Sequence, residues 1–245
     1  MELKSYLNDI EKFLKGYLSS NGMDTYVLGV SGGVDSSLCA ALARNAVGKD
    51  KLHCLIIPID SAQEDIDDAL TLVKDLDLKY DIIDASETFH AYLRDFEKCG
   101  MIFDRSTLGN LKARMRMSIL YAVAQKERGL VIGTDNADER CVGYFTKYGD
   151  GACDILPIAH LVKAEVVEAS KILGIRTSLA ERVPTAGLYE GQTDEKEMGV
   201  SYKDLDAYVL GKEVNETAKK RIQYLERISE HKRKPIPMPE EFKRD

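Results

Sequence analysis

The residues best suited to chemistry lie in one short turn, residues 29–37, which reads Gly-Val-Ser-Gly-Gly-Val-Asp-Ser-Ser. An apolar run at residues 25–30 leads into the turn, and an alanine-rich segment at residues 36–46 follows it. Adjacent glycines let the backbone approach a ligand closely, and a helix that begins after them points its unpaired N–H groups at an anion. The turn is therefore predicted to bind phosphate groups.

The same turn also indicates a divalent cation. It matches neither the G-x-x-x-x-G-K-[ST] phosphate loop nor the G-x-G-x-x-G dinucleotide fingerprint. Instead Asp35 stands at the start of the predicted helix, where a carboxylate and a phosphate repel each other unless a divalent cation bridges them. We expect Mg²⁺ as this cation. The alternative is a tight glycine turn in which Asp35 is an ordinary N-cap residue.

Around this turn, apolar runs that predict buried strands alternate with apolar residues at helical spacing that predict helices. The predicted strands are residues 25–30, 52–57, 80–83, 130–133 and a short fifth at 155–158. The predicted helices are residues 3–18, 36–46, 66–76, 87–98, 108–127, 163–173, 204–210 and 214–229. Residues 134–154 lack such periodicity and are predicted to form a long loop that is functional or mobile. Crossovers between such strands are right-handed and give a parallel sheet covered on both faces, so we expect a doubly wound, Rossmann-like α/β fold.

The composition favours one acidic globular domain. The chain has 245 residues, of which 44% are hydrophobic, and folding at such a length buries roughly 70–75% of the unfolded chain's surface. The 41 acidic residues outnumber the 34 basic ones, and the net charge of −7 argues against a nonspecific nucleic-acid partner. The five cysteines form no C-x-x-C pair, and charges interrupt the apolar residues of the N-terminus, so neither a zinc site, a disulfide framework nor a signal peptide is indicated. No stretch approaches the roughly 20 apolar residues of a membrane span, and we expect a cytoplasmic protein without a membrane partner.

The turn resembles the pyrophosphate loop of the ATP pyrophosphatases, which cleave ATP between the α and β phosphates and transfer AMP to an acceptor oxygen. Later motifs resemble ammonia-dependent NAD synthetase in order and spacing: GNLKARMRM at 109–117, GTDNADE at 133–139, YFTKYGDG at 144–151, PTA at 184–186, QTDE at 192–195 and HKR at 231–233. This resemblance covers essentially the whole chain. It implies a single synthetase domain over residues 1–245 with no glutaminase domain, and ammonia, free or supplied by a separate protein, as the nitrogen source.

The reaction implied by the resemblance converts the nicotinate carboxylate of deamido-NAD into an amide. Ammonia cannot attack a carboxylate until that group carries a better leaving group, and adenylation by ATP supplies one. The carboxylate oxygen attacks the α-phosphate, pyrophosphate leaves with Mg²⁺, and ammonia then displaces AMP. Catalysis of such a transfer is mostly positioning and electrostatic stabilisation.

By the same resemblance, two acids hold Mg²⁺ and a larger set of residues holds ATP. The metal ligands are Asp35 and Glu139; each follows a predicted strand, and ligand groups gather at the carboxyl ends of strands in open α/β sheets. The ATP-binding residues are Gly29, Val30, Ser31, Gly32, Gly33, Val34, Asp35, Ser36, Thr134, Lys163 and Thr185. Asp35 and Lys163 are also expected to be catalytic. For Glu139 and Lys163 the alternative is a solvated surface position, and Lys163 opens a predicted helix, an unusual place for a cation.

The resemblance implies contacts of deamido-NAD with Arg114, Lys147, Asp154, His231 and Lys232. For Arg114 and the adjacent pair His231 and Lys232, solvated surface charge is the alternative. Asp150 is expected near the reacting carboxyl group, where as a catalytic residue it would accept a proton from ammonium. A plain turn aspartate is the competing interpretation of Asp150.

In this family the deamido-NAD site is built across a homodimer, so the resemblance implies one here. The amphipathic first helix is expected to dock either on its own domain or on the partner subunit. An apolar stripe within the helix predicted at residues 108–127 is either a subunit interface or part of the core; it consists of Met115, Ile119 and Ala122.

Two segments depart from the family pattern, and two other functions stay open. Residues 58–65 read PIDSAQED where many relatives carry Tyr-Gly and Gln-x-Asp-Glu, and Asn136 stands where many bacterial members have His; neither is assigned a role. Another adenylating enzyme of the superfamily, such as a tRNA-modifying enzyme, would need a basic surface and an RNA-binding appendage. A non-catalytic adenine-nucleotide binding module would not need Asp35 and Glu139, nor Lys163 and Thr185.

Overall fold

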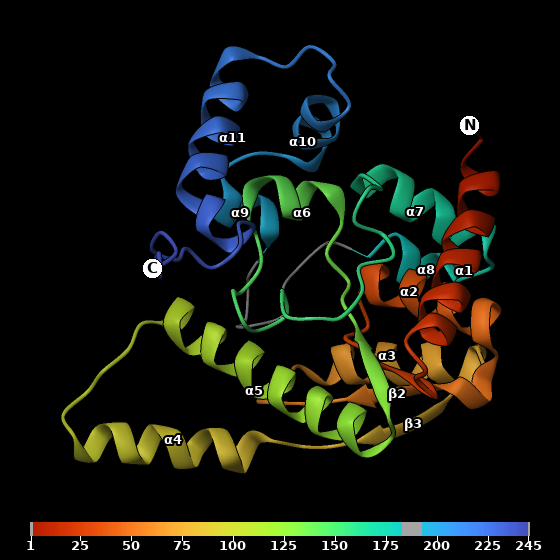
Figure 1. Cartoon of the computed structure of the whole chain (residues 1–245), viewed down its shortest axis with the longest axis horizontal. Helices are drawn as coiled ribbons and strands as arrows, with labels where there is room; N and C mark the ends of the chain where they lie inside the picture. Colours follow the sequence, from red (N-terminus) through yellow and green to blue (C-terminus); the bar gives the residue numbers. More distant parts are fainter. Residues whose placement is uncertain (1, 183–192, 245) are drawn as a thin grey trace.

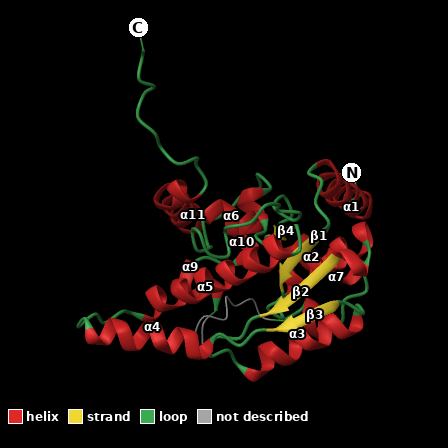
Figure 2. Cartoon of the chain, turned by 60° about the horizontal axis from the view of Figure 1, so that its bottom comes forward, coloured by secondary structure: helices red, strands yellow, loops and turns green. Residues whose placement is uncertain are grey.

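The computed structural model describes residues 2–182 and 193–244 (Figure 1). Its centre is a four-stranded parallel sheet in the order β3-β2-β1-β4 (Figure 2). The strands are β1 (Thr25–Gly29), β2 (Leu52–Ile56), β3 (Lys79–Ile82) and β4 (Gly129–Ile132). The chain builds β2 and β3 on one side of β1 and then returns to place β4 on the other side. Open α/β sheets bind ligands where the strand order reverses in this way, so the edge of the sheet beyond β1 and β4 is the expected site.

The predicted fifth strand at residues 155–158 is wrong. Ile155 forms only an isolated parallel bridge with Ile132, and its carbonyl accepts the Gly133 N–H over 2.9 Å. Pro157, two residues on, has no N–H to donate to a ladder, which explains why the pairing does not continue.

Helices cover both faces of the sheet because β1 is apolar on both. Tyr26 and Leu28 face one core cluster and Val27 faces another, and all three side chains are fully buried. The first cluster packs against α1 (Leu3–Ser20), α2 (Val34–Val47), α3 (Gln63–Asp75) and α7 (Lys163–Ile172), and the second against α4 (Ser86–Lys98) and α5 (Arg105–Lys126). The doubly wound α/β architecture predicted from the sequence is confirmed.

The remaining helices follow β4. They are α6 (Ala137–Val142), α8 (Thr177–Ala180), α9 (Asp194–Met198), α10 (Tyr202–Val209) and α11 (Glu216–Ser229), with short 3₁₀ turns at Lys49–Lys51 and Glu230–Lys232. A third apolar cluster joins α6 to α9, α10 and α11, which lie beyond the carboxyl ends of the strands (Figure 1). The sequence missed α6, because only six residues form it and a capping box rather than periodicity marks its start.

The structure also tests where the first helix docks and whether a helix could cross a membrane. The α1 side chains Leu7, Ile10, Leu14 and Leu18 are buried in the first core cluster, so the first helix docks on its own domain. Within residues 2–182 and 193–244, no helix combines the length and apolar character that a bilayer crossing needs.

Candidate active site

The loop predicted to bind phosphate lies between β1 and α2. The Ser31 hydroxyl accepts the Gly33 N–H over 3.2 Å and lies 3.1 Å from the Ser36 hydroxyl. Gly32 has φ +80°, and a Cβ there would lie 2.8 Å from the Asp65 carbonyl oxygen, so this position requires glycine. Gly33 is the N-cap residue of α2 and supplies no side chain, which leaves the first N–H groups of the helix available to an anion.

The N-cap interpretation of Asp35 is wrong. Asp35 lies in the first turn of α2 rather than at the cap, and its carboxylate instead contacts residues from α7 and from the start of α6. The side chain is therefore turned away from the helix terminus and toward the carboxyl edge of β4.

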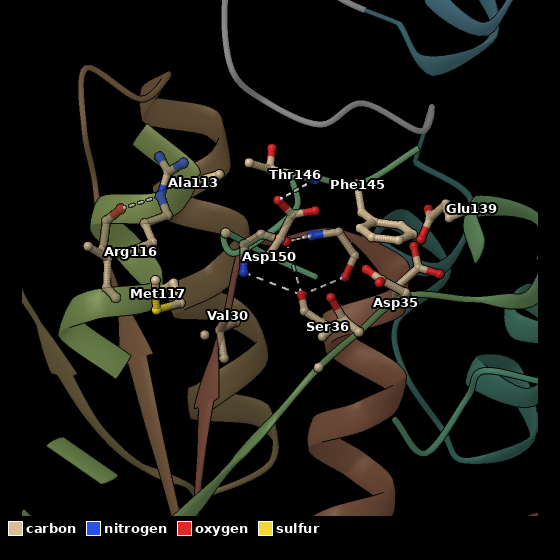
Figure 3. A pocket seen from close by; sticks show the side chains of 18 of the residues that line it. Val30, Asp35, Ser36, Ala113, Arg116, Met117, Glu139, Phe145, Thr146 and Asp150 are labelled. Carbon is tan, nitrogen blue, oxygen red and sulfur yellow. Dashed lines mark hydrogen bonds between the residues drawn. The ribbon is translucent and has the colours of Figure 1, made fainter. Parts of the chain in front are cut away.

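A cavity of about 470 Å³ opens at the carboxyl ends of β1, β2 and β4. Its lining includes the loop residues 29–31 and 33–36, Thr134 after β4, and the acidic residues Asp35, Glu139 and Asp150. Figure 3 shows Asp35 and Glu139 close together on one side, with Arg116 and Met117 of α5 across from them. A cavity of this size at this edge is typical of nucleotide and small-molecule sites.

Asp35, Glu139 and Lys163 form a buried charge cluster. Its two carboxylates, Asp35 and Glu139, are the acid pair. The Lys163 ammonium lies 2.6 Å from Asp35 Oδ2 and 3.4 Å from Glu139 Oε1. Burial and the neighbouring Asp35 carboxylate raise the pKa of Glu139 to about 7. Burial acts to lower the pKa of Lys163, but the two carboxylates outweigh it and the pKa is raised. The surface alternatives for Glu139 and Lys163 are therefore wrong, because both side chains are more than four-fifths buried.

The donor set of the acid pair fits Mg²⁺. Mg²⁺ in phosphate-transfer sites takes one or two carboxylates and completes its shell with water and substrate phosphate oxygens. Asp35 and Glu139 are two such carboxylates beside a phosphate-binding loop, and a cation there would offset the burial that opposes their ionisation. No group of three or more His, Cys, Asp or Glu side chains suited to a metal occurs in the described part of the chain.

Lys163 is the first residue of α7, where the helix dipole disfavours a cation. Two carboxylates near its backbone N–H offset this effect. The Lys163 N–H is within 2.6 Å of Asp138 Oδ2 and 3.1 Å of Asp206 Oδ1. Asp138 is fully buried, and burial together with a hydrogen bond to Asp206 raises its pKa to about 8. These two acids anchor the first residue of α7 and so fix the origin of the Lys163 side chain. Sequence reasoning missed both, since neither stands in a recognised motif position with an assigned role.

A second set of charges, the Asp150 group, consists of Asp135, Asp150 and Lys232, which also line the cavity. Asp150 Oδ1 accepts the Thr146 N–H over 3.0 Å, and burial raises the pKa of Asp150. Burial, with the nearby Asp150 carboxylate, raises the pKa of Asp135 well above its ordinary value. Burial lowers the pKa of Lys232, whose ammonium donates to the carbonyls of Gly143 and Phe145 over 2.7 and 2.6 Å.

Comparisons with known proteins agree with this geometry. The model of the NAD synthase family matches residues 6–236. The chain belongs to the NAD synthase family. The NH3-dependent NAD(+) synthetase of Mesoplasma florum is 42% identical over 244 residues, which cover 100% of both chains.

Two solved structures from the comparison have the same fold. One, titled as the NMN synthetase from Francisella tularensis, has a TM-score of 0.92 at 38% identity and covers 98% of this chain and 99% of its own. The NH3-dependent NAD synthetase from Campylobacter jejuni has a TM-score of 0.81 at 28% identity, covering 98% and 100%. Membership of this family of ATP-dependent ligases decides against the tRNA-modifying and non-catalytic alternatives.

Some of the residues predicted from the NAD synthase motifs line the cavity, and others lie outside it. Apart from Gly32 and the unplaced Thr185, every residue assigned to ATP or metal lines the cavity, and so do Asp150 and Lys232. Thr185 and the motif at 184–186 lie outside the described residues. Gly32 instead packs tightly against the backbone of α3, and this contact holds the loop against that helix.

Four residues assigned to deamido-NAD do not line the cavity of this chain. Arg114 is exposed on α5 and donates from Nε to the Lys147 carbonyl over 3.3 Å, and Lys147 Nζ donates to the His231 carbonyl over 2.7 Å. These three residues are therefore linked to one another on the surface. Asp154 accepts the Val131 N–H over 2.7 Å and the Tyr121 hydroxyl over 3.3 Å, so it holds the end of β4 in place.

Arg116 is a cavity-lining residue that the sequence reasoning did not assign. It donates from Nε to the Ile57 carbonyl over 3.0 Å and from Nη2 to the Ser61 hydroxyl over 3.3 Å. These bonds tie α5 to the segment at 58–65 that departs from the family pattern. Its position two residues after Arg114 in the KARMRM motif was the available signal.

The apolar stripe predicted at Met115, Ile119 and Ala122 on α5 lies partly in the core and partly on the surface. Met115 and Ile119 pack in the second core cluster, so core packing accounts for them. Ala122 is exposed.

Proposed function

We propose that this NAD synthase family member makes NAD from deamido-NAD, ammonia and ATP, through an adenylated carboxylate, and releases AMP and pyrophosphate. The observation that carries the proposal is the convergence of Asp35, Glu139 and Lys163 beside the phosphate-binding loop in one cavity. Phosphoryl and nucleotidyl transfer depend on positioning and charge stabilisation rather than on a nucleophilic side chain. This cluster offers both.

In the first half-reaction, the backbone N–H groups of the loop and the start of α2 bind the phosphates of ATP. Asp35 and Glu139 would hold Mg²⁺, which would supply positive charge to the phosphate oxygens. Lys163, fixed at its backbone by Asp138 and Asp206, places an ammonium beside the same oxygens. The nicotinate carboxylate then attacks the α-phosphate, and the pyrophosphate leaves from the cationic end of the cavity.

In the second half-reaction, ammonia displaces AMP from the acyl adenylate. Asp150 lines the cavity, and its raised pKa makes it a stronger base than an ordinary aspartate, which suits a group that takes a proton from ammonium. We propose ammonia as the nitrogen source, because the relative matched over its full length carries the name of an NH3-dependent enzyme.

The residues assigned to deamido-NAD support a proposed homodimer. Arg114, Lys147 and His231 lie linked on the surface outside the cavity, as expected if a partner completes the substrate site. The α4–α5 connection exposes Met101, Ile102 and Phe103, and Ile102 is 96% exposed. Exposed apolar residues gathered at one place are typical of a protein interface. A cytoplasmic location also stays a prediction.

The test combines purified protein, Mg-ATP, ammonium chloride and deamido-NAD and measures all products. We expect NAD, AMP and pyrophosphate in equal amounts, with no turnover when deamido-NAD or ammonium is left out. Release of ADP, or turnover without deamido-NAD, would contradict the proposal.

A second candidate substrate is the nicotinate mononucleotide, which lacks the adenylate half of deamido-NAD. The observation that favours it is the TM-score of 0.92 with the protein titled as an NMN synthetase, against 0.81 with the Campylobacter jejuni NAD synthetase. The chemistry at the nicotinate carboxylate is the same for both substrates. A competition assay with both nicotinates present decides between them by the ratio of their kcat/KM values.

A further inference from the structure

Asn136 is fully buried between β4 and α6, and both the oxygen and the nitrogen of its side-chain amide form hydrogen bonds. Its Oδ1 accepts the N–H groups of Asp138 and Glu139, each over 3.0 Å, which caps α6. Its backbone N–H donates to Glu139 Oε2 over 3.2 Å, which completes a capping box. One carboxylate oxygen of Glu139 is thereby fixed by Asn136.

The other half of the amide reaches a different element. Asn136 Nδ2 donates to Asp35 Oδ1 over 2.9 Å, although Asp35 lies 101 positions earlier in the chain, on α2. Asn136 therefore holds one oxygen of each member of the acid pair. Lys163 contacts the other oxygen of each, Asp35 Oδ2 and Glu139 Oε1.

Capping alone does not explain an asparagine here. Serine, threonine and aspartate cap helices about as well, because a cap needs only an acceptor oxygen. Asparagine differs from serine and threonine because its donor is an amide nitrogen separate from the accepting oxygen, on a longer side chain, and here that nitrogen donates to a carboxylate. An aspartate at this position would instead add a third buried carboxylate beside Asp35.

We propose that Asn136 is a positioning residue that orients the carboxylates of Asp35 and Glu139 toward one shared divalent cation. The inference rests on the proposed function, because that function identifies Mg²⁺ as the cation that Asp35 and Glu139 bind. Groups that hydrogen-bond to metal-ligating carboxylates set ligand orientation, and their loss costs about 10–100-fold in metal affinity or activity.

Two substitutions separate the cap from the positioning role. Asn136→Ser keeps an acceptor for the α6 N–H groups but is too short and lacks the amide donor to Asp35. Asn136→Ala removes both. Asn215→Ser is the matched control, because Asn215 caps α11 through the Ala218 N–H and no hydrogen bond joins its side chain to an acidic residue of the described chain.

The readout is Mn²⁺ affinity, measured by electron paramagnetic resonance with ATP present and no nicotinate substrate, together with the thermal unfolding midpoint. We expect both Asn136 variants to bind Mn²⁺ about 10–100-fold more weakly than the wild type. We also expect Asn136→Ser to unfold at a higher temperature than Asn136→Ala, and Asn215→Ser to bind Mn²⁺ normally.

Wild-type Mn²⁺ affinity in Asn136→Ser would overturn the inference, because capping would then be the residue's whole role. Failure of the wild type to bind Mn²⁺ with ATP would also overturn it. A wild type that binds Mn²⁺ but makes no NAD refutes the proposed function and leaves the role of Asn136 standing.

Discussion

The acid pair and the Asp150 group face the same cavity but are held in different ways. In the acid pair, every carboxylate oxygen has a side-chain or backbone donor, from Asn136, Lys163 or Tyr202. In the Asp150 group, Lys232 donates to backbone carbonyls rather than to a carboxylate, and Asp150 keeps a raised pKa. We propose that the acid pair, held at every oxygen, binds a cation and phosphate. We propose that the Asp150 group, whose lysine is bound to backbone carbonyls, takes part in proton transfer instead.

The largest expected effect comes from removing a metal ligand from the acid pair. Asp35→Asn keeps the shape of the side chain but removes its charge, so kcat/KM for NAD formation should fall by about 10³-fold or more. Asp9→Asn, at an exposed ion pair on α1, is the control and should leave activity unchanged. Full activity in Asp35→Asn would remove Asp35 from its proposed role.

Lys163→Met tests whether the acid pair depends on its counter-charge. The Lys163 side chain is 7% exposed, and its loss leaves two buried carboxylates facing each other. Removing one partner of a buried ion pair costs about 3–5 kcal/mol of unfolding free energy. Chemical denaturation should report a loss of this order, and added Mg²⁺ should restore more stability to the variant than to the wild type. An equal response to Mg²⁺ in both proteins would argue against a shared cation site.

Asp150→Asn tests the contrasting region. Asparagine can still accept the Thr146 N–H, so the fold should persist, while the loss of a general base should lower kcat by about 10²-fold. The loss should lie in the ammonia step, in which AMP is released, while pyrophosphate formation in the adenylation half-reaction should be less affected. An equal loss in both half-reactions would make Asp150 a binding residue instead.

Asp138→Asn should change the pH dependence of stability. The pKa of Asp138 is raised from 3.8 to about 8 in the folded protein, so the fold binds this proton more tightly than the unfolded chain does. Its contribution is therefore complete below about pH 4 and is lost as the pH rises toward 8. Asparagine mimics the protonated form, so the decline in unfolding free energy between pH 5 and 8 should be shallower, by up to about 4 kcal/mol, or about 1.4 kcal/mol per pH unit. Parallel curves for wild type and variant would contradict the assignment.

The sequence predicted those parts of the molecule that short-range pattern determines. The apolar strands and the glycine turn are local signals, and the four-stranded sheet and the position of the turn between β1 and α2 followed from them. Asp35 was predicted from the turn itself and Glu139 and Lys163 from the family resemblance, and all three line one cavity. The fifth strand failed because Pro157 outweighs a short apolar run.

The missed residues depend on contacts between distant segments. Asn136 meets Asp35 across 101 positions, and Asp206 meets the start of α7 across 43. Nothing in the local sequence of Asn136 predicts an acidic partner on α2. Such contacts form only when the sheet places β1 beside β4, so a single sequence does not contain them as a pattern.

Transfer of oxygen tests the central claim most directly. Deamido-NAD, labelled with ¹⁸O in its nicotinate carboxylate, is turned over with unlabelled Mg-ATP and ammonium, and the products are examined by mass spectrometry. If the carboxylate attacks the α-phosphate, each AMP carries one ¹⁸O and the pyrophosphate carries none. Label in pyrophosphate or inorganic phosphate, or AMP without label, would contradict the adenylation mechanism.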